Sequence, residues 1–191
     1  LIDSVDHISN DVRPYIELCN FLKNQDLHPP HLTDKDTVES ILKKCNSRYL
    51  THGVDSFSKI DSNSIDIIFS QAVLEHVEKD IFVREMKECF RVGKDDSVHS
   101  HEVDLRDHLS ESLNNLRFSE SVWESNFFKS SGFYTNRIQL EEMKLIFSRC
   151  GFMYKIISVD SWNELPIQKK KLNNLFRGLS DDNLKVKVFN V

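Results

Sequence analysis

The chain has 191 residues, with 25 basic and 30 acidic side chains and a formal net charge of −5 at pH 7. Its length and its 39% hydrophobic content are ordinary for a globular domain with a core of its own. The acidic balance argues against a nucleic-acid surface, which normally needs a basic face. No apolar run approaches the roughly 18 residues of a membrane span, and no basic segment followed by an apolar one marks a secretory signal.

Cysteine and glycine usage adds two expectations. The four cysteines, Cys19, Cys45, Cys89 and Cys150, form no CxxC pair, which favours reduced thiols and a cytoplasmic location. Only five glycines are present and none lies within a GxG. Because the chain starts with Leu1 inside an apolar stretch, we expect a truncated domain.

The first 60 residues alternate between strand and helix patterns. Residues 1–8 alternate as a strand does, and apolar spacing predicts a helix over 12–24 with Pro14 in its first turn. A second helix is expected to run to about Cys45, capped by Thr33 or Asp34. Residues 47–53 are predicted to form a short strand.

The remainder continues the alternation. Residues 64–70 are nearly continuous in β-formers, which predicts a strand buried on both faces of a parallel sheet. Helices are expected over 80–90 and 140–150, and strands over 98–104, 152–159 and 184–191. The last of these alternates cleanly, as an edge strand with one wet face does. Together these elements predict an α/β fold.

A segment rich in aromatic residues, Ser and Asn interrupts this alternation after residue 108. It is interpreted as an insertion over the sheet. The predicted organisation is therefore a cofactor-side half over 1–108, an insertion or lid over 109–137, and a C-terminal part over 138–191 that completes the same domain.

Residues 63–77, N-S-I-D-I-I-F-S-Q-A-V-L-E-H-V, resemble class I S-adenosylmethionine-dependent methyltransferases at the fourth strand and its exit. Residues 85–92, 101–104 and 150–152 are similar to later family segments in the expected order, and 184–191 fit the antiparallel seventh strand. The resemblance covers about residues 1–160. It implies a Rossmann-like methyltransferase sheet with an antiparallel last strand, and methyl transfer from S-adenosylmethionine to a small-molecule acceptor.

The sequence departs from the family at its glycine-rich turn. Family members end their first strand in GxGxG, which lets the backbone approach the methionine part of the cofactor. This chain has no such turn, so the resemblance implies that the first strand and turn are missing just before residue 1. The turn after Val92 reads G-K-D-D-S and is also atypical. A sheet with a missing strand leaves edges open, so we expect association, as in a homodimer, or a segment that fills the gap.

The resemblance also assigns cofactor contacts. Asp3, with Asp6 in reserve, corresponds to the carboxylate that binds the ribose hydroxyls, because a carboxylate accepts two hydrogen bonds from a diol. Asp55 corresponds to the acidic position near the adenine amino group. The flanking and strand-exit positions that border the cofactor are Val54, Ser56, Ser70, Gln71 and Ala72. The alternative for Asp3 and Asp6 is an ordinary role in turns and caps.

Residues 98–108 hold the densest group of bases and ligands. On a strand, His101, Asp104 and His108 are expected to converge near the carboxyl end of the sheet, where ligands of open α/β folds bind. Methyl transfer needs an acceptor stripped of its proton and held in line. We therefore predict His101 as general base, with His76 and Glu75 as alternatives. Asp104 and His108 are expected to contact the acceptor.

Two other interpretations of this segment stay open. Two His and two Asp within eight residues suit an N/O metal site, but the spacing matches no specific zinc pattern, so no metal is predicted. A solvated strand end with a cap at Asp107 is the simpler interpretation.

The insertion carries six aromatic residues within 17 positions, followed by Asn136 and Arg137. The aromatic residues suit the walls of an acceptor pocket, in which Asn136 and Arg137 are expected to grip a carboxylate or phosphate. A packed lid that uses the same aromatics as its core is the alternative.

Three functions are therefore weighed. The first is S-adenosylmethionine-dependent methyl transfer to a small molecule, with no membrane or nucleic-acid partner. The second is a non-catalytic methyltransferase-like interaction protein. The third is a metal-dependent hydrolase using His101, Asp104 and His108.

Overall fold

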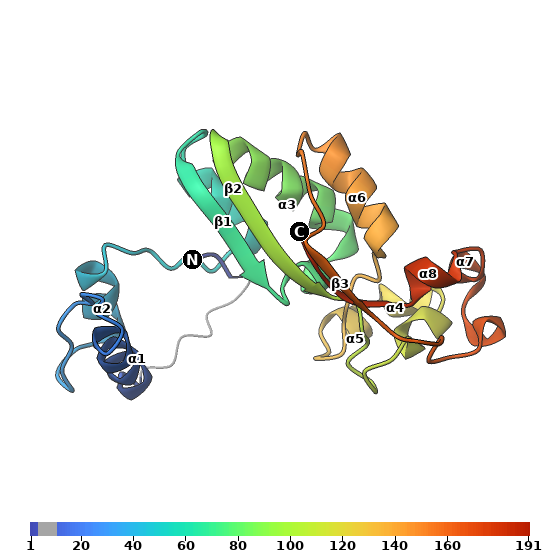
Figure 1. Cartoon of the computed structure of the whole chain (residues 1–191), viewed down its shortest axis with the longest axis horizontal. Coiled ribbons are helices and arrows are strands. Elements are labelled where there is room, and N and C mark those ends of the chain that lie inside the picture. Colours follow the sequence, from blue (N-terminus) through green and yellow to red (C-terminus); the bar gives the residue numbers. More distant parts are fainter. Residues whose placement is uncertain (4–10) are drawn as a thin grey trace. The chain divides into compact units, whose positions relative to one another are not determined.

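The computed structural model describes residues 1–3 and 11–191 and divides into two compact units, Leu1–Lys59 and Ile60–Val191 (Figure 1). Asp6 and most of the strand predicted over 1–8 lie outside the described residues. In the part of the chain that is described, no helix has the length and apolar character needed to cross a membrane.

The first unit is built on two short helices. Helix α1 (Arg13–Lys23) has Pro14 in its first turn, where the missing N–H costs little, as predicted. Helix α2 (Val38–Lys44) lies beyond a long loop. Buried Cys19, Leu32 and Ile41 form a small core between these elements.

The cap of α2 is not the one predicted. Thr37 caps the helix, because its Oγ1 accepts a hydrogen bond from Ser40 N (3.2 Å) and Ser40 Oγ accepts one from Thr37 N (3.1 Å). Thr33 instead donates its backbone N–H to the Asp36 carboxylate (2.8 Å), which holds it in the preceding loop. The prediction of Thr33 or Asp34 is therefore wrong.

The strand predicted over 47–53 is also wrong. With the described residues, this segment forms a single parallel bridge, between Ile2 and Leu50. Gly53, with φ of 49°, turns the backbone into the left-handed region and opens the 3-10 helix η1 (Gly53–Lys59). The turn therefore ends the extended segment at Gly53.

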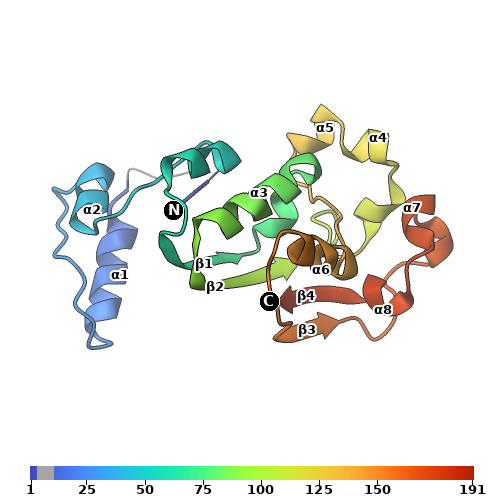
Figure 2. The ribbon, with the colours of Figure 1, turned by 90° about the horizontal axis from the view of Figure 1, so that it is seen from above.

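The second unit contains a four-stranded sheet. Its strands are β1 (Ile65–Gln71), β2 (Gly93–Asp104), β3 (Ser158–Ser161) and β4 (Val186–Asn190), in the order β1-β2-β4-β3 (Figure 2). Strands β1 and β2 are parallel, and β4 is antiparallel to both of its neighbours. The predicted α/β class and antiparallel last strand are confirmed.

Helices α3 (Lys79–Val92) and α6 (Leu140–Arg149) pack on one face of this sheet (Figure 2). The apolar residues of α3 recur at helical spacing and are buried: Phe82, Met86, Cys89 and Val92. They face a sheet interior that includes the fully buried Val103 and Phe189. This layer is the main core of the second unit.

Three predictions about the strands are corrected. Strand β1 is not buried on both faces, because Ile67 and Phe69 are 66% and 79% exposed while the helices cover the opposite face. Strand β4 is not an edge strand: it lies between β2 and β3, which explains why Phe189 is fully buried. Four strands are present among the described residues where six were expected.

The turn predicted after Val92 lies at a break in the β1–β2 ladder. Ile65 pairs with Gly93 but Ile67 pairs with Val98, so the residues between Gly93 and Val98 leave the regular register. The segment after Val92 is therefore an irregular part of β2 that still pairs with β1 at both of its ends, and it is not a separate loop.

Apart from α6 and β3, residues 109–184 supply short helices at one end of the sheet (Figure 1). They are η3 (Asn114–Arg117), α4 (Glu120–Trp123), α5 (Asn126–Lys129), η4 (Lys169–Lys171), α7 (Asn174–Arg177) and α8 (Asp181–Leu184). Leu113, Leu116, Leu172, Phe176 and Leu184 form a second core cluster. The segment after residue 108 thus packs with residues from the C-terminal part of the chain.

Candidate active site

The carboxyl ends of β1 and β2 lie at one edge of the sheet because the two strands are parallel. After β1, Ala72 adopts φ of 50° and donates its N–H to Glu102 O (3.0 Å), and the chain turns into the 3-10 helix η2 (Leu74–His76). A left-handed Ala is strained, and such strain is often found at functional sites. The turn brings the V-L-E-H segment to the end of β2.

Glu75 is buried in this turn, with only 1% of its surface exposed. Burial raises the pKa of its carboxyl to about 7, although the backbone N–H groups of Glu75 and Asp104 oppose the rise. Neither carboxylate oxygen makes a hydrogen bond of ordinary geometry with a described residue. Glu75 is therefore a carboxyl group poised to exchange a proton near neutral pH.

His76 and His108 meet beside Glu75. Their ring centroids are 4.8 Å apart, with the rings at 68° to each other. His76 Nδ1 lies 3.0 Å from Tyr134 O, and because a carbonyl oxygen only accepts, Nδ1 carries the proton. Burial lowers the pKa of His76, and His108 lowers it further. A neutral His76 protonated at Nδ1 presents a basic Nε2.

Asp104 ends β2 near this pair but is already engaged. Its carboxylate accepts from Arg106 Nε (3.0 Å), from Arg106 Nη2 (2.7 Å) and from the Arg106 backbone N–H (3.0 Å). Burial acts to raise the pKa of Asp104, but the hydrogen bonds from Arg106 bring it below its usual value. Asp104 is therefore a fixed negative charge.

Asp107 is a buried residue whose structural role the sequence indicated only as a cap. Its carboxylate accepts hydrogen bonds from the backbone N–H groups of Leu109, Ser110 and Asn114. These bonds hold the loop that follows His108, which fixes where that ring lies. In the sequence, an Asp followed by polar residues is typical of a turn, and this was the signal available for Asp107.

His101 occupies a different environment from His76. Its side chain lies on the helix-covered face of β2, where Nδ1 is 2.7 Å from Ser70 Oγ on β1. Burial lowers the pKa of His101 to about 4, and neighbouring His99 adds to the effect. The structure thus groups Glu75, His76, Asp104 and His108, and places His101 with Ser70.

Asn136 and Arg137 bind groups within the chain. Asn136 is buried and donates its Nδ2 to Leu74 O (2.8 Å) and Val77 O (2.9 Å), and its backbone N–H to Glu75 O (2.7 Å). These three bonds hold both sides of the turn that carries Glu75 and His76.

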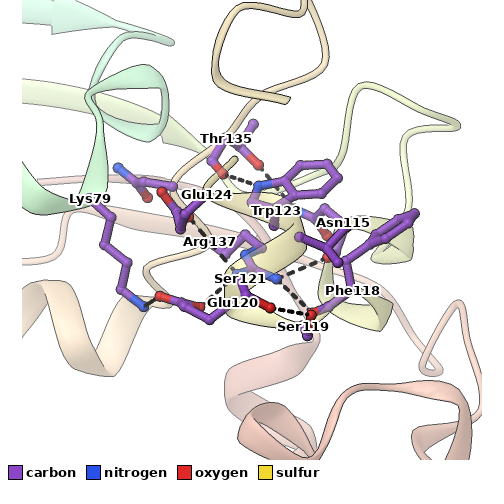
Figure 3. Close-up of polar contacts among 12 residues, drawn as sticks. Lys79, Asn115, Phe118, Ser119, Glu120, Ser121, Trp123, Glu124, Thr135 and Arg137 are labelled. Atoms are coloured by element: carbon purple, nitrogen blue, oxygen red, sulfur yellow. Dashed lines mark hydrogen bonds and ion pairs between the residues drawn. The ribbon is translucent and has the colours of Figure 1, made fainter. Parts of the chain in front are cut away.

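Arg137 anchors the insertion (Figure 3). Its fully buried guanidinium pairs with Glu120 (2.6 Å), donates to Phe118 O (2.9 Å), and lies 5.5 and 5.2 Å from the ring centroids of Trp123 and Phe176. Trp123 also contacts the rings of Phe118, Phe128 and Tyr134, so these four aromatic residues of the insertion pack as a core beside Arg137, whereas Phe127 and Phe133 are exposed.

The predicted adenosine contacts in the first unit lie close together. Asp3 accepts a hydrogen bond from Tyr49 Oη (3.1 Å), and its backbone carbonyl accepts from Gly53 N (2.7 Å). The following residues are a buried Val54, an exposed Asp55 and a buried Ser56 whose Oγ accepts from His52 N (3.0 Å).

These residues fit the cofactor in part. Two carboxylates, Asp3 and Asp55, suit the ribose hydroxyls and the adenine amino group. None of the five glycines stands in a GxG, so the 191 residues offer no turn of that kind for the methionine part. Ser70, Gln71 and Ala72 lie at the exit of β1, as expected from the sequence.

No group of three or more His, Cys, Asp or Glu side chains is placed to hold a metal ion within residues 1–3 and 11–191. The set proposed for a hydrolase, His101, Asp104 and His108, is divided because His101 turns toward Ser70. The metal-dependent hydrolase therefore has no support in the site.

No protein-family model and no curated protein sequence matches this chain. It is similar to solved structures of S-adenosylmethionine-dependent methyltransferases. One, phosphoethanolamine N-methyltransferase 2 of Haemonchus contortus, was solved with phosphomonomethylethanolamine and S-adenosylhomocysteine; identity is 15% and the TM-score 0.37, over 66% of this chain and 27% of that one.

The similarity extends over a larger share of both chains for one archaeal and one bacterial structure. An Archaeoglobus fulgidus S-adenosylmethionine-dependent methyltransferase is 11% identical with a TM-score of 0.44, over 91% of this chain and 79% of that one. YcgJ of Bacillus subtilis is 18% identical with the same TM-score of 0.44, over 99% of this chain and 76% of that one. This chain thus spans about a quarter of the Haemonchus protein and three quarters of the other two.

Proposed function

We propose that this chain takes part in methyl transfer from S-adenosylmethionine to a small-molecule acceptor at the carboxyl edge of β1 and β2. The observation that carries the proposal is the pairing of His76 with His108 beside a buried Glu75, within the V-L-E-H segment that resembles the methyltransferase family. The strand order, with an antiparallel β4 beside β2, agrees with that resemblance.

His76 is assigned the role of general base, in place of His101. Its Nδ1 proton is directed at Tyr134 O, so the lone pair of Nε2 is available to take a proton from an acceptor hydroxyl or amine. Asp104, whose negative charge already acts to raise the pKa of His76, then stabilises the resulting imidazolium. Glu75, whose pKa is raised to about 7, is a second proton-exchanging group in the same turn. S-adenosylmethionine, when bound, supplies an electrophilic methyl group.

The remaining residues position these two groups. His108 is exposed and lies at the ring edge of His76, where it is placed to contact the acceptor. Asp104 adds a fixed negative charge at the same edge. Asn136 and Arg137 hold the turn and the insertion rather than the acceptor, because their side chains are engaged within the chain.

Calorimetric titration of S-adenosylhomocysteine into the chain tests the cofactor assignment. We expect saturable binding that weakens at least about tenfold in Asp55→Asn, since one charge-assisted hydrogen bond contributes roughly 1.5 kcal/mol or more. Asp34→Asn, an exposed carboxylate in the α1–α2 loop, is the matched control and should bind normally. Absence of binding by the folded chain would contradict the proposal.

A second candidate is a non-catalytic methyltransferase-like interaction protein. The absence of any GxG from the 191 residues favours it, because the family uses that turn to approach the cofactor. It predicts a folded chain that does not bind S-adenosylhomocysteine. The same titration therefore separates the two candidates.

We further propose that the chain works as a homodimer in the cytoplasm. Within residues 1–3 and 11–191, strand β1 ends the sheet with β2 as its neighbour, and its Ile67 and Phe69 side chains are exposed. Pairing with β1 of a second copy covers the open backbone edge and gives the two exposed side chains apolar neighbours on the adjacent strand. The four cysteines are free, which agrees with a reducing compartment.

A further inference from the structure

A cavity of about 560 Å³ lies on the helix-covered face of β2, away from the Glu75–His76 turn. Helix α3 and helix α6 form two of its walls, and residues 152–157, which follow α6, form a third. This volume lies within the range of small-molecule pockets, which is about 300–1,000 Å³. The cavity belongs entirely to the second unit.

The walls are mainly aromatic and aliphatic. Phe152 makes edge-to-face contacts with the rings of Phe90 (5.2 Å between centroids) and His99 (4.9 Å). Met86 and Phe147 complete the apolar lining from α3 and α6. Such walls favour a planar apolar molecule, since ring contacts add to the free energy of burial.

The floor carries two imidazoles from alternate positions of β2, His99 and His101, whose centroids are 6.3 Å apart. His99 Nδ1 is buried and has no hydrogen-bond partner among the described residues, while its Nε2 lies 3.3 Å from Ser97 Oγ. A buried polar atom without a partner is costly, so this nitrogen is a ready acceptor or donor for a ligand.

The two histidine rings at the floor of the cavity carry little charge. Burial lowers the pKa of His99 and of His101, so both rings are neutral at pH 7. The charged residues of the lining lie apart from this floor: Asp95 and Lys155 are exposed, and Lys94 pairs with Asp66 (2.6 Å). An ionised group held against the neutral rings and the aromatic walls is therefore disfavoured, because charge is expensive to bury without a counter-ion. An uncharged hydroxyl group, in contrast, gives His99 Nδ1 the hydrogen bond that it lacks.

We propose that this cavity binds an uncharged aromatic molecule carrying a hydroxyl group, a phenol in chemical class, with its ring among Phe90, Phe147 and Phe152 and its hydroxyl on His99. The site is separate from the proposed methyl-transfer site. It requires neither S-adenosylmethionine nor turnover, so it stands or falls independently of that function.

Three probes of one shape test the proposal on the unmodified chain: 2-naphthol, naphthalene and 2-naphthoate. Titration followed by NMR, with ¹⁵N-labelled histidine, reports both affinity and location. We expect 2-naphthol to bind in a 1:1 ratio, at least tenfold more tightly than naphthalene or 2-naphthoate, and to shift the His99 ring signals. Equal affinity for the three probes, tighter binding of 2-naphthoate, or unshifted His99 signals would overturn the proposal.

A variant pair then isolates the hydrogen bond. His99→Phe keeps a planar ring of similar size but removes both nitrogens, so the preference for 2-naphthol over naphthalene should disappear. His28→Phe, an exposed histidine in the first unit, should leave that preference unchanged. If His99→Phe retains the full preference for 2-naphthol over naphthalene, the hydroxyl forms its hydrogen bond with another group and the assignment to His99 is wrong. Because the three-probe comparison uses the unmodified chain, a folding defect in the variant leaves the main test intact.

Discussion

Ser70 Oγ lies 2.7 Å from His101 Nδ1, across the parallel pair β1–β2. The two residues are direct partners in the register of the ladder, so the contact is set by the sheet itself. The hydrogen bond and the surrounding helices hold the imidazole in the interior. His101 is therefore a neutral buried group, and its protonation is coupled to folding.

The stability of the chain should report this coupling. The folded-state pKa of His101 is about 4 against 6.5 when unfolded, so below pH 6.5 the unfolded state binds more protons. The contribution of His101 to the free energy of unfolding is complete above pH 6.5 and falls as the pH drops toward 4. At 1.36 kcal/mol per pKa unit, the loss reaches up to about 3 kcal/mol. Urea unfolding at a series of pH values measures it.

The matched comparison is His101→Gln against His28→Gln. The difference in unfolding free energy between the wild type and His101→Gln should shrink as the pH falls from 6.5 to 4. The exposed His28→Gln should follow the wild type throughout. A constant difference for His101→Gln over this interval would show that His101 is not held neutral by the fold.

Glu75 should have the opposite dependence. Its folded-state pKa is raised from 4.5 to about 7, so between these values the folded state binds more protons and stability falls as the pH rises. Glu75→Gln removes this loss, and at pH 8 it should stabilise the chain by up to about 3 kcal/mol, with little effect at pH 4. The free energy of unfolding of both proteins at pH 4, 6 and 8 checks it.

Exposed Glu142→Gln on α6 is the control for Glu75→Gln and should give no such trend. A stabilisation that is the same at pH 4 and pH 8 would contradict a raised pKa. Loss of methyl transfer in Glu75→Gln together with higher stability would fit a functional carboxyl group kept at a cost in stability.

Asn136 should be important for the shape of the Glu75–His76 turn. Asn136→Ala removes the donor to Leu74 O and Val77 O and leaves two inward-facing carbonyls without it. We expect a loss of about 2–3 kcal/mol in unfolding free energy, because unpaired buried polar groups cost about 1–3 kcal/mol. Thermal or urea unfolding measures the loss, and exposed Asn126→Ala serves as the control. A change below that of Asn126→Ala would mean that the turn holds its shape without Asn136.

The sequence predicted the elements that depend on local pattern. The β-formers of 64–70 and the spacing of Phe82, Met86 and Cys89 define β1 and α3, and the antiparallel β4 follows from the family resemblance. The cap at Thr37 was missed because Thr33 also precedes the helix, and only the Ser40 hydrogen bonds distinguish them.

Long-range contacts account for the other misses. The side-chain direction of His101 depends on its register against β1, which no local pattern gives. Arg137 had the chemistry of an anion-binding residue, but Glu120 and Trp123 of α4 and Phe176 of α7 surround it in the fold. The sequence identified the residue and its ion-pairing ability, and tertiary packing determined the partner.

Arg137 itself offers a test of that network (Figure 3). Arg137→Lys keeps the charge but loses the planar fork that pairs with Glu120, donates to the carbonyls of Asn115 and Phe118, and stacks near Trp123. We expect a loss of about 2–4 kcal/mol in unfolding free energy, since disrupting a buried charge network costs about that much. Exposed Arg117→Lys should change it by less than about 0.5 kcal/mol. Equal effects of the two substitutions would contradict an anchoring role for Arg137.

The exposed face of β1 leads to the last prediction. Phe69 is 79% exposed and Ile67 66% exposed on a strand that ends the sheet among the described residues, and two copies that pair their β1 strands place these side chains beside apolar neighbours across the new strand pair. Sedimentation should therefore show a dimer for the wild type. Phe69→Glu should shift it toward monomer, because pairing then brings two like charges into an apolar contact. Phe127→Glu, an equally exposed phenylalanine in α5 at 76% exposure, should leave the dimer intact. A monomeric wild type at the highest accessible concentration would refute pairing through β1.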